Sequence, residues 1–222
     1  AGLTAAFHLA RLGHQVTVFE ENEHAGGMLR HGMPAYRMPN SVLDRDIKNV
    51  TALGVEIKTG APVKRLGDLK EEGYDATFVA VGGQVPRIVP IKGEDLVNVG
   101  DCMEFLKNTK LADEMPDLTG MNVVVIGGGN VAIDVARSAI RLGTESVSMV
   151  CLEARDKMLA HEFEIVEAEE EGIDIFSAAS VTKVHAVVEG KTSLEFVKVT
   201  ALDFSGGTMH LETEAGSEKS IP

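Results

Sequence analysis

Apolar and polar positions along the chain form one pattern that occurs twice. A helix of small and apolar residues ends in Arg-Leu-Gly at residues 2–13 and again at 132–143, and the two segments align without a gap. A β-branched run follows each helix, Val16–Phe19 in the first copy and Val147–Val150 in the second. The pattern predicts the helix–strand half of a mononucleotide-binding βαβ unit, present twice. The alternative is two unrelated helices that share a tripeptide.

The second copy is complete. Met121–Ile126 predicts a buried strand of the parallel-sheet type, and Gly127–Ala132 reads G-x-G-x-x-A between that strand and the helix. In this motif Gly127 would permit a tight turn, Gly129 would let the backbone approach a pyrophosphate, and Ala132 would keep the helix close to the strand. The helix N-terminus would offer free N–H groups to the phosphates, so the sequence predicts a dinucleotide site here.

The first copy begins inside its motif. Its strand and leading glycines would lie before residue 1, so we expect the chain to be a fragment of a longer protein. Gly2 then stands where the motif has its third glycine. Glu20 ends the second strand, where an acid can accept hydrogen bonds from an adenosine ribose.

Between the copies, Ser41–Leu53 predicts a helix, Val55–Ile57 a strand, and Tyr74–Gly83 a strand ending in glycines that could close over a nucleotide. The residues of that helix expected to face inward are Val42, Ile47, Val50 and Leu53. Near the end of the chain, three alternating runs predict an antiparallel meander. These runs are 181–188, 194–200 and 208–213.

The predicted fold class is α/β, with two Rossmann-like three-layer lobes built on parallel sheets and an added antiparallel β-meander. We expect the first lobe at residues 1–95, a crossover at 96–119, and the second lobe with its meander at 120–222.

Composition narrows the possible functions. The net charge of −13 would repel a phosphate backbone, so nucleic-acid binding is not expected. No apolar run approaches the roughly 20 residues of a membrane span, and no secretory signal opens the sequence. Cys102 and Cys151 lie far apart and form neither a disulfide framework, a C-x-x-C pair nor a metal cluster. A cytoplasmic location is the default expectation.

Several motifs together resemble the small (beta) subunit of glutamate synthase and its relatives, which include the reductase module of dihydropyrimidine dehydrogenase. The resemblance covers essentially the whole chain, and its most specific element is Gly-x-Pro-x-x-Arg-x-Pro at residues 32–39. The other matching segments are Val18–Glu21, Gly26–Met28, Leu53–Val55, Phe78–Gly82 and Val125–Asp134.

This resemblance implies a flavoprotein reductase, in which the first lobe binds FAD and the second a nicotinamide dinucleotide. Electrons would pass from NAD(P)H to FAD and then to iron–sulfur clusters in a preceding domain or partner subunit. The implied FAD contacts are the stretch from Glu20 to Met28, with Glu21, Gly27 and Met28, then Arg37, Val63 against the adenine, and Gly82. The implied contacts of the dinucleotide pyrophosphate are Gly128, Gly129, Asn130 and Val131.

Two departures from the family concern completeness. The family normally returns after its meander with a strand and glycine-rich turn that completes the flavin site, and the chain stops before that segment. The iron–sulfur cysteines expected upstream are also absent, so the clusters are expected only outside this fragment. We therefore expect the fragment alone to hold FAD poorly or not at all.

A third departure concerns the dinucleotide. NADP-dependent relatives carry two basic residues after the second strand, and here that pair is Leu152-Glu153. A carboxylate at this position can bond a ribose 2′-OH and would repel a 2′-phosphate, so we expect NAD(H) to be preferred over NADP(H). The alternative is that Glu153 points to solvent and Arg155 folds back to bind NADP.

Other residues have plainer interpretations. Both cysteines are expected to be structural, His31 an ordinary loop histidine, and the acidic run Glu167–Glu171 a solvated helix face. Arg30 and Arg37 could be surface charges only, although the motif favours a functional Arg37. Two function classes stay open, a redox module that turns over and a module that only binds a dinucleotide. A disulfide reductase is disfavoured because the chain has no dithiol.

Overall fold

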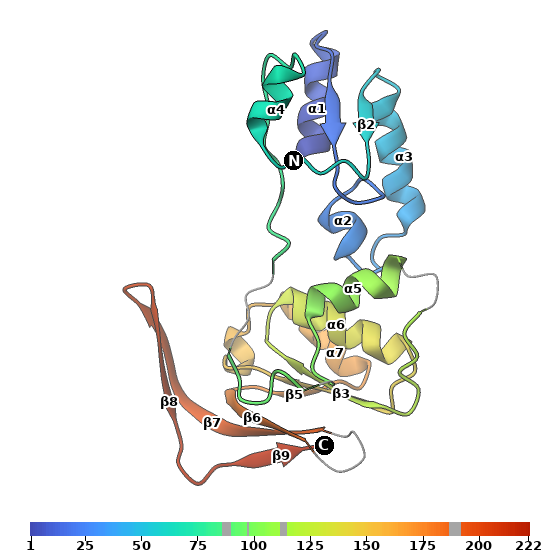
Figure 1. Cartoon of the computed structure of the whole chain (residues 1–222). Coiled ribbons are helices and arrows are strands. Elements are labelled where there is room, and N and C mark those ends of the chain that lie inside the picture. Colours follow the sequence, from blue (N-terminus) through green and yellow to red (C-terminus); the bar gives the residue numbers. More distant parts are fainter. Residues whose placement is uncertain (86–89, 97, 112–114, 187–191) are drawn as a thin grey trace. The chain divides into compact units, whose positions relative to one another are not determined.

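A computed structural model describes residues 1–85, 90–96, 98–111, 115–186 and 192–222. Contacts within the chain divide it into two compact units, Ala1–Val85 and Pro86–Pro222. Both units contain parallel strands, and the second also has an antiparallel sheet, which confirms the predicted mixed α/β class (Figure 1). The division falls ten residues before the boundary expected at residue 95.

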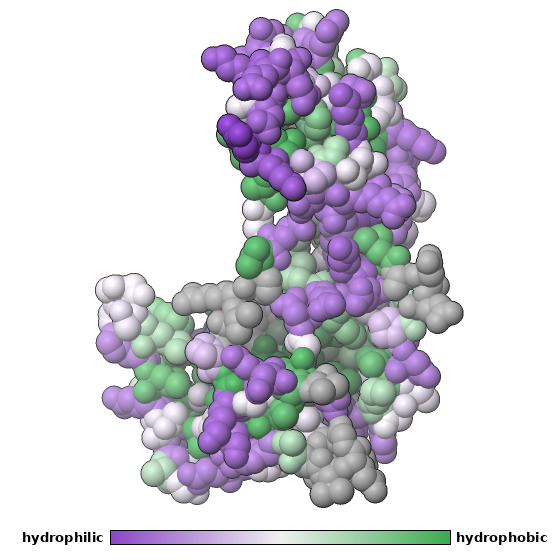
Figure 2. Space-filling view, viewed as in Figure 1, coloured by the Kyte–Doolittle hydropathy of each residue, from purple (hydrophilic) through white to green (hydrophobic). Residues whose placement is uncertain are grey.

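The first unit packs two helices on a two-stranded parallel sheet, in which Val18 lies opposite Ile57. Its core cluster consists of Ala6, Val50 and Val55, with half-buried neighbours such as Phe7 around them. The elements are α1 (Gly2–Arg11), β1 (Thr17–Phe19), α2 (Met28–His31), α3 (Asn40–Thr51), β2 (Glu56–Lys58) and α4 (Leu66–Glu71). In Figure 2 the visible face of this unit is mainly hydrophilic, as the charge of the chain leads one to expect.

Helix α3 confirms an expected element but corrects its inward face. Val50 is buried as predicted, whereas Val42 is 36% exposed and Leu53 is 41% exposed. Leu43 and Val50 are buried and Ile47, also expected to face inward, is half-buried, and these three are spaced i, i+4 and i+7 in a stripe along one side of the helix. Val42 lies one position off this stripe, and Leu53 follows the last helical residue, Thr51.

The strand expected at residues 74–83 is wrong for this structure. The segment has no regular secondary structure, and the side chains of Phe78, Val79 and Val81 are 64%, 57% and 79% exposed. A strand exists only where its N–H and C=O groups meet a neighbouring ladder. Within residues 1–85 the strands are β1 and β2, which pair with each other, and no ladder is formed with this segment.

The second unit has three layers. The parallel sheet β3-β4-β5 packs on helices α5, α6 and α7 through one face and on the antiparallel sheet through the other. Strand β4 shows why: Met149 belongs to the helix-side cluster and Val150 to the cluster on the opposite face, and both are at most 1% exposed. Successive residues of a strand point to opposite faces of the sheet, so these two side chains stabilise different interfaces. Burying each side chain contributes roughly 1.5–3 kcal/mol.

The described elements of the second unit are α5 (Cys102–Leu111), β3 (Asn122–Ile126), α6 (Asn130–Arg141), β4 (Ser146–Val150), the short 3-10 helix η1 (Arg155–Lys157), α7 (Glu162–Glu170), β5 (Asp174–Phe176), β6 (Ala179–Ala186), β7 (Thr192–Ser205), β8 (Thr208–Thr213) and β9 (Lys219–Ile221). Helix α5 lies in the segment expected to be a crossover. Its Leu106 is 2% exposed and belongs to the same core cluster as α6, so this helix is part of the second unit.

The antiparallel meander is confirmed. Strand β7 pairs with β6 and β9 along its first half and with β8 along its second, and it extends as a hairpin away from the sheet (Figure 1). Near the tip, exposed Phe204 lies opposite Met209. Of the run expected at residues 181–188, the part up to Ala186 belongs to β6, and the last two residues lie outside the described ones. In the described part of the chain, every helix is too short or too polar to span a membrane.

Candidate functional site

The glycine loop of the second unit joins β3 to α6 as its sequence predicted. Gly127 has a φ of +134°, a conformation that side chains rarely adopt, and its N–H donates to the Val150 carbonyl at 2.9 Å. A Cβ atom at Gly127 would lie 3.5 Å from the Cβ of Ala132. The small residue at 132 therefore lets the first turn of α6 pack directly on the loop.

Helix α6 presents its N-terminus to this loop. Gly129 is the N-cap residue, and the first intrahelical bond runs from the Ile133 N–H to the Gly129 carbonyl at 3.2 Å. The N–H groups of Asn130, Val131 and Ala132 thus have no acceptor inside the helix, and the positive end of the helix dipole adds to them. Apart from its own chain neighbours, no atom of the described residues lies within 4 Å of a Cβ built on Gly129, so its surroundings are open.

Gly128 makes the closest approach in the site. A Cβ atom there would lie 2.9 Å from the Cβ of Cys151 and 3.0 Å from Oε2 of Glu153. The loop therefore packs against the end of β4, with Cys151 only 2% exposed. Burial, with the nearby charge of Glu153, raises the pKa of Cys151 to about 11. The thiol is protonated at neutral pH, which fits the packing role expected of it.

Glu153 and Arg155 turn in different directions after β4. The Glu153 carbonyl accepts from the Ala178 N–H at 2.7 Å, and its carboxylate lies beside Gly128. Arg155 donates from Nε and Nη2 to Glu169 at 2.8 and 2.9 Å, and from Nη1 to Glu162 at 3.0 Å. These hydrogen bonds raise the pKa of Arg155 and lower that of Glu169. The acid therefore faces the glycine loop, while the base is held by α7.

The segment before α7 is anchored to the same loop. The Ala160 N–H donates to the Gly128 carbonyl at 3.0 Å, and the His161 N–H donates to Oδ1 of Asn130 at 2.9 Å. Asn130 was expected to hold a pyrophosphate, and in the structure its side-chain oxygen fixes this neighbouring segment. Val131 is 44% exposed at the helix start. The structure thus brings Gly127 to Val131 and Glu153 together in one place.

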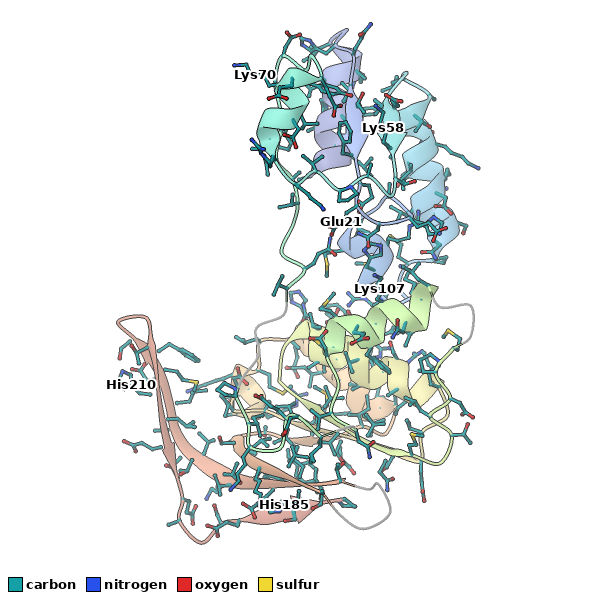
Figure 3. All side chains as sticks on the ribbon, in the orientation of Figure 1. Glu21, Lys58, Lys70, Lys107, His185 and His210 are labelled. Carbon is teal, nitrogen blue, oxygen red and sulfur yellow. The ribbon has the colours of Figure 1, made fainter. Side chains whose placement is uncertain are left out.

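In the first unit, Glu20 follows β1 directly. Its N–H donates to the Lys58 carbonyl at 2.9 Å, which continues the ladder with β2. Its Oε1 accepts from the backbone N–H and the side-chain amide of Asn22 at 2.9 and 2.8 Å. The other oxygen, Oε2, takes no part in that turn. Glu21, the next residue, is exposed just beyond the strand, at the end nearer α2 (Figure 3).

A cavity of about 250 Å³ lies beside the end of β1. Val63, which the resemblance implies would contact an adenine, is among its lining residues, and Glu20 is not. The volume is below the roughly 300 Å³ of small ligand pockets, so it could accept only part of a dinucleotide. The residues lining it are Phe19, Ala61, Pro62, Val63, Lys64, Asp68, Leu69 and Glu72.

The other expected FAD contacts of this unit lie around α2 and near the start of α1. Gly27 is the N-cap of α2 with φ +57°, Met28 is its first residue and 38% exposed, and Arg37 is exposed after a turn in which its N–H donates to Pro34 at 3.1 Å. Gly2 would place a Cβ 3.5 Å from that of Ala80, so the segment leading to Gly82 passes the start of α1.

Two residues near this region differ from expectation. Arg30 is 7% exposed, and its guanidinium donates to the Ala25 carbonyl at 3.0 Å and to the carboxylate of Asp44. It is therefore a buried structural residue and not a surface charge. His31 is 4% exposed at the end of α2 and not in an open loop. A local sequence pattern does not contain the distant partner, Asp44, that makes burial of Arg30 possible.

The acidic run on α7 is also more than a solvated face. Glu167 accepts from Nη1 of Arg137 at 2.6 Å, and Glu171 accepts from Arg137 and Arg141 at 2.6–3.1 Å. These ion pairs join α7 to α6. The signal in the sequence was the matching pair of arginines four residues apart on α6, at the same spacing as the acids.

Comparison with known proteins places this chain in a family. The family model described as pyridine nucleotide-disulphide oxidoreductase matches residues 1–206. The beta subunit of NADP(+)-dependent formate dehydrogenase from Moorella thermoacetica is 42% identical over 177 residues, which are 78% of this chain and 25% of that protein. The PreT subunit of NAD-dependent dihydropyrimidine dehydrogenase from Salmonella typhimurium is 35% identical over 206 residues, 88% of this chain and 49% of the relative.

Glutamate synthase [NADH] from Schizosaccharomyces pombe is 37% identical over 159 residues, 66% of this chain and 8% of that protein. Among solved structures, FprA from Mycobacterium tuberculosis in complex with NADPH has a TM-score of 0.79 at 18% identity, covering 99% of this chain and 65% of that one. That likeness concerns the fold alone. The chain spans half or less of the length of these curated relatives. The family match over residues 1–206 includes the glycine motif at residues 127–132, and the chain belongs to the pyridine nucleotide-disulphide oxidoreductase family.

Proposed function

We propose that this chain is the nucleotide-binding part of a glutamate synthase small-subunit-like reductase, with FAD in the first unit and NAD(H) in the second. When bound, the two cofactors supply hydride transfer from the nicotinamide to the flavin. Electrons would then pass to an iron–sulfur domain or partner subunit. The observation that carries this proposal is the strand, glycine loop and helix start of residues 122–131 with an acid beside the loop.

The second unit has the groups that a dinucleotide requires. The N–H groups of Asn130 and Val131 would bind the pyrophosphate, helped by the positive end of the α6 dipole. The open space at Gly129 fits a phosphate group that approaches the backbone. Gly128, whose position against Cys151 leaves no room for a side chain, would hold the loop close enough to β4 for Glu153 to face the bound nucleotide.

The placement of Glu153 supports NAD(H) over NADP(H). Its carboxylate lies at the loop and could accept a hydrogen bond from a ribose 2′-OH, while a 2′-phosphate would meet like charge. One hydrogen bond to a charged acceptor contributes roughly 1.5–3 kcal/mol, and a tenfold difference in affinity takes about 1.4 kcal/mol. We therefore expect a preference of about one to two orders of magnitude. The names of relatives include both dinucleotides, so the preference rests on this geometry.

In the first unit, the proposed FAD contacts surround the end of β1. Oε2 of Glu20 would accept from the adenosine ribose, and Val63 in the neighbouring cavity would contact the adenine. Gly27, Met28 and Arg37 lie between β1 and α3, on the way from the adenosine to the rest of the cofactor in this proposal. We predict that Glu20 and Arg37 face one nucleotide groove.

The test of this proposal uses the intact protein that contains the chain. A redox module should carry a yellow flavin that NADH bleaches anaerobically, and a module that only binds the dinucleotide should not. Glu153→Arg should shift kcat/KM toward NADPH, while Glu170→Arg, the same charge change at an exposed position of α7, should leave the preference unchanged. Equal or better use of NADPH by the wild type would contradict the assignment.

A further inference from the structure

Arg155 is the basic residue that could reverse the expected cofactor preference, because it follows Glu153 by two positions. All three nitrogens of its guanidinium are occupied. Nε and Nη2 bond both oxygens of Glu169 in a bidentate pair, and Nη1 bonds Glu162. The side chain is 31% exposed, so the contacts lie at the surface, yet they use two carboxylates for one cation.

The two acids come from the first and last parts of α7, seven residues apart, and bond different nitrogens of the guanidinium. Bidentate pairing fixes the orientation of an arginine more firmly than a single contact does. The same fork geometry is what a phosphate would use to bind this side chain. Arg155 therefore has two alternative kinds of partner, the carboxylates of α7 or a phosphate on a bound nucleotide.

We infer that Glu162 and Glu169 determine dinucleotide specificity, because they hold Arg155 on α7 and so keep it from serving as a base for the 2′-phosphate of NADP(H). This inference rests on the proposed dinucleotide site of the second unit. Two groups of acids at different places would then discriminate NAD(H) from NADP(H). Glu153 repels the phosphate at the loop, and the pair on α7 withholds the cation that would attract it.

The strength of the contacts between Arg155 and the two carboxylates determines how much their removal should change the affinity for NADP(H). An exposed ion pair is individually weak, but here two carboxylates hold one guanidinium through three hydrogen bonds, and an arginine that has lost both is available to a phosphate dianion. A new charge-assisted contact to phosphate corresponds to about a tenfold gain in affinity or more. The contact concerns the 2′ position only, so the affinity for NAD+ should stay within about twofold, because NAD+ has a hydroxyl there.

The experiment measures Kd of NAD+ and NADP+ by titration of the intact protein. We expect Glu162→Gln/Glu169→Gln to bind NADP+ about tenfold more tightly than wild type and NAD+ about equally. The decisive control adds Arg155→Ala to this double variant, which should abolish the gain. Glu170→Gln removes one charge from an exposed site on the same helix and should not change either affinity.

Each outcome separates the inference from the proposed function. A gain for NADP+ that persists without Arg155 would show a general charge effect and overturn the inference, as would no gain at all. If the wild type binds neither dinucleotide, the proposed function itself fails. Should the double variant also lose NAD+ affinity, Glu162→Gln alone decides. It removes the negative charge at position 162 and so weakens that contact, and it leaves the pair with Glu169 intact, so we expect a smaller gain that again requires Arg155, and no gain would overturn the inference.

Discussion

The two units contain the same helix–strand pattern, but the helix is buried far more in the second unit than in the first. Helix α1 buries only Ala6, whereas α6 buries seven residues, from Ala132 to Ala139. The two helices align without a gap and share Ala6/Ala136 and a terminal Arg-Leu-Gly, but what lies beneath them differs. Helix α6 covers a three-stranded sheet and packs on two further helices, while α1 covers a sheet of two strands. Similar local patterns thus acquire different burial from different surroundings.

The acids that follow the two strands, Glu20 and Glu153, also differ in their surroundings. Glu20 uses Oε1 to hold the turn at Asn22, and Glu153 directs Oε2 to the glycine loop at Gly128. In the second unit the loop, the strand end and the acid are packed into one site. In the first unit the corresponding acid is tied to its own turn. Three pairs of substitutions, each a test with a matched second variant, can break or sharpen this comparison.

The largest expected effect is at Gly128. Gly128→Ala would place a Cβ 2.9 Å from that of buried Cys151, and neither the strand end nor the loop can move without disturbing the core. We expect a loss of about 3 kcal/mol in the free energy of unfolding of the second unit, at the upper end for overpacking. Affinity for NADH should also fall at least tenfold, or about 1.4 kcal/mol. Denaturant unfolding and NADH titration measure these two quantities.

The matched control is Gly129→Ala. Among the described residues other than its chain neighbours, no atom lies within 4 Å of a Cβ there, and the backbone φ is −96°. The stability cost should therefore stay below about 1 kcal/mol, as for a change of N-cap residue. Binding should nevertheless weaken, because the added methyl would occupy the space proposed for phosphate. Equal stability of the two variants would show that the loop is not packed on β4 as the structure describes.

How far the sequence alone could predict the molecule differs between these regions. The loop at Gly127, its strand and its helix are specified by neighbouring residues, so a local pattern was sufficient. The exposed state of the segment around Phe78 and the burial of Arg30 depend on distant strands and on Asp44, which periodicity does not contain. The partners of Arg155 lie on another helix and were not predicted, although the acids themselves were visible in the sequence.

Arg30 gives the second test, because it supports the first unit where the apolar core is small. Arg30→Ala removes hydrogen bonds to the Ala25 carbonyl and to Asp44 from a side chain that is 8% exposed. Charged hydrogen bonds contribute roughly 1.5–3 kcal/mol each, and Asp44 is half exposed and can recover water. We therefore expect a loss of about 2 kcal/mol, and hydrogen exchange should report it in peptides of α2 and α3.

Arg37→Ala separates support from binding in the same region. Arg37 is exposed, and we expect less than about 1 kcal/mol of destabilisation together with lower flavin occupancy in the intact protein. A loss of stability as large as that of Arg30→Ala, with unchanged flavin content, would reverse the roles given to the two arginines.

The smallest expected effect concerns the ion pairs that add to the core of the second unit. Hydrogen bonds from Arg141, followed by those from Arg137, lower the pKa of Glu171 from 4.5 to about 2, while burial opposes the shift. A carboxyl with a lowered pKa stabilises the folded state fully above its unfolded pKa of 4.5, and this contribution is lost as the pH falls toward 2. The side chain is 25% exposed, so solvent screening limits the contribution.

Glu171→Gln should therefore cost about 1 kcal/mol at neutral pH, measured as the change in the free energy of unfolding by urea. The sign of the pH dependence makes the test specific: the difference between wild type and variant should be constant above pH 5 and should shrink as the pH falls below 4.5. Glu170→Gln, at the exposed neighbouring position, should show no such difference. If the difference in the free energy of unfolding between wild type and Glu171→Gln stays constant into the acid range, Glu171 stabilises the second unit through packing alone. The ion pairs between α6 and α7 would then not distinguish this unit from the first.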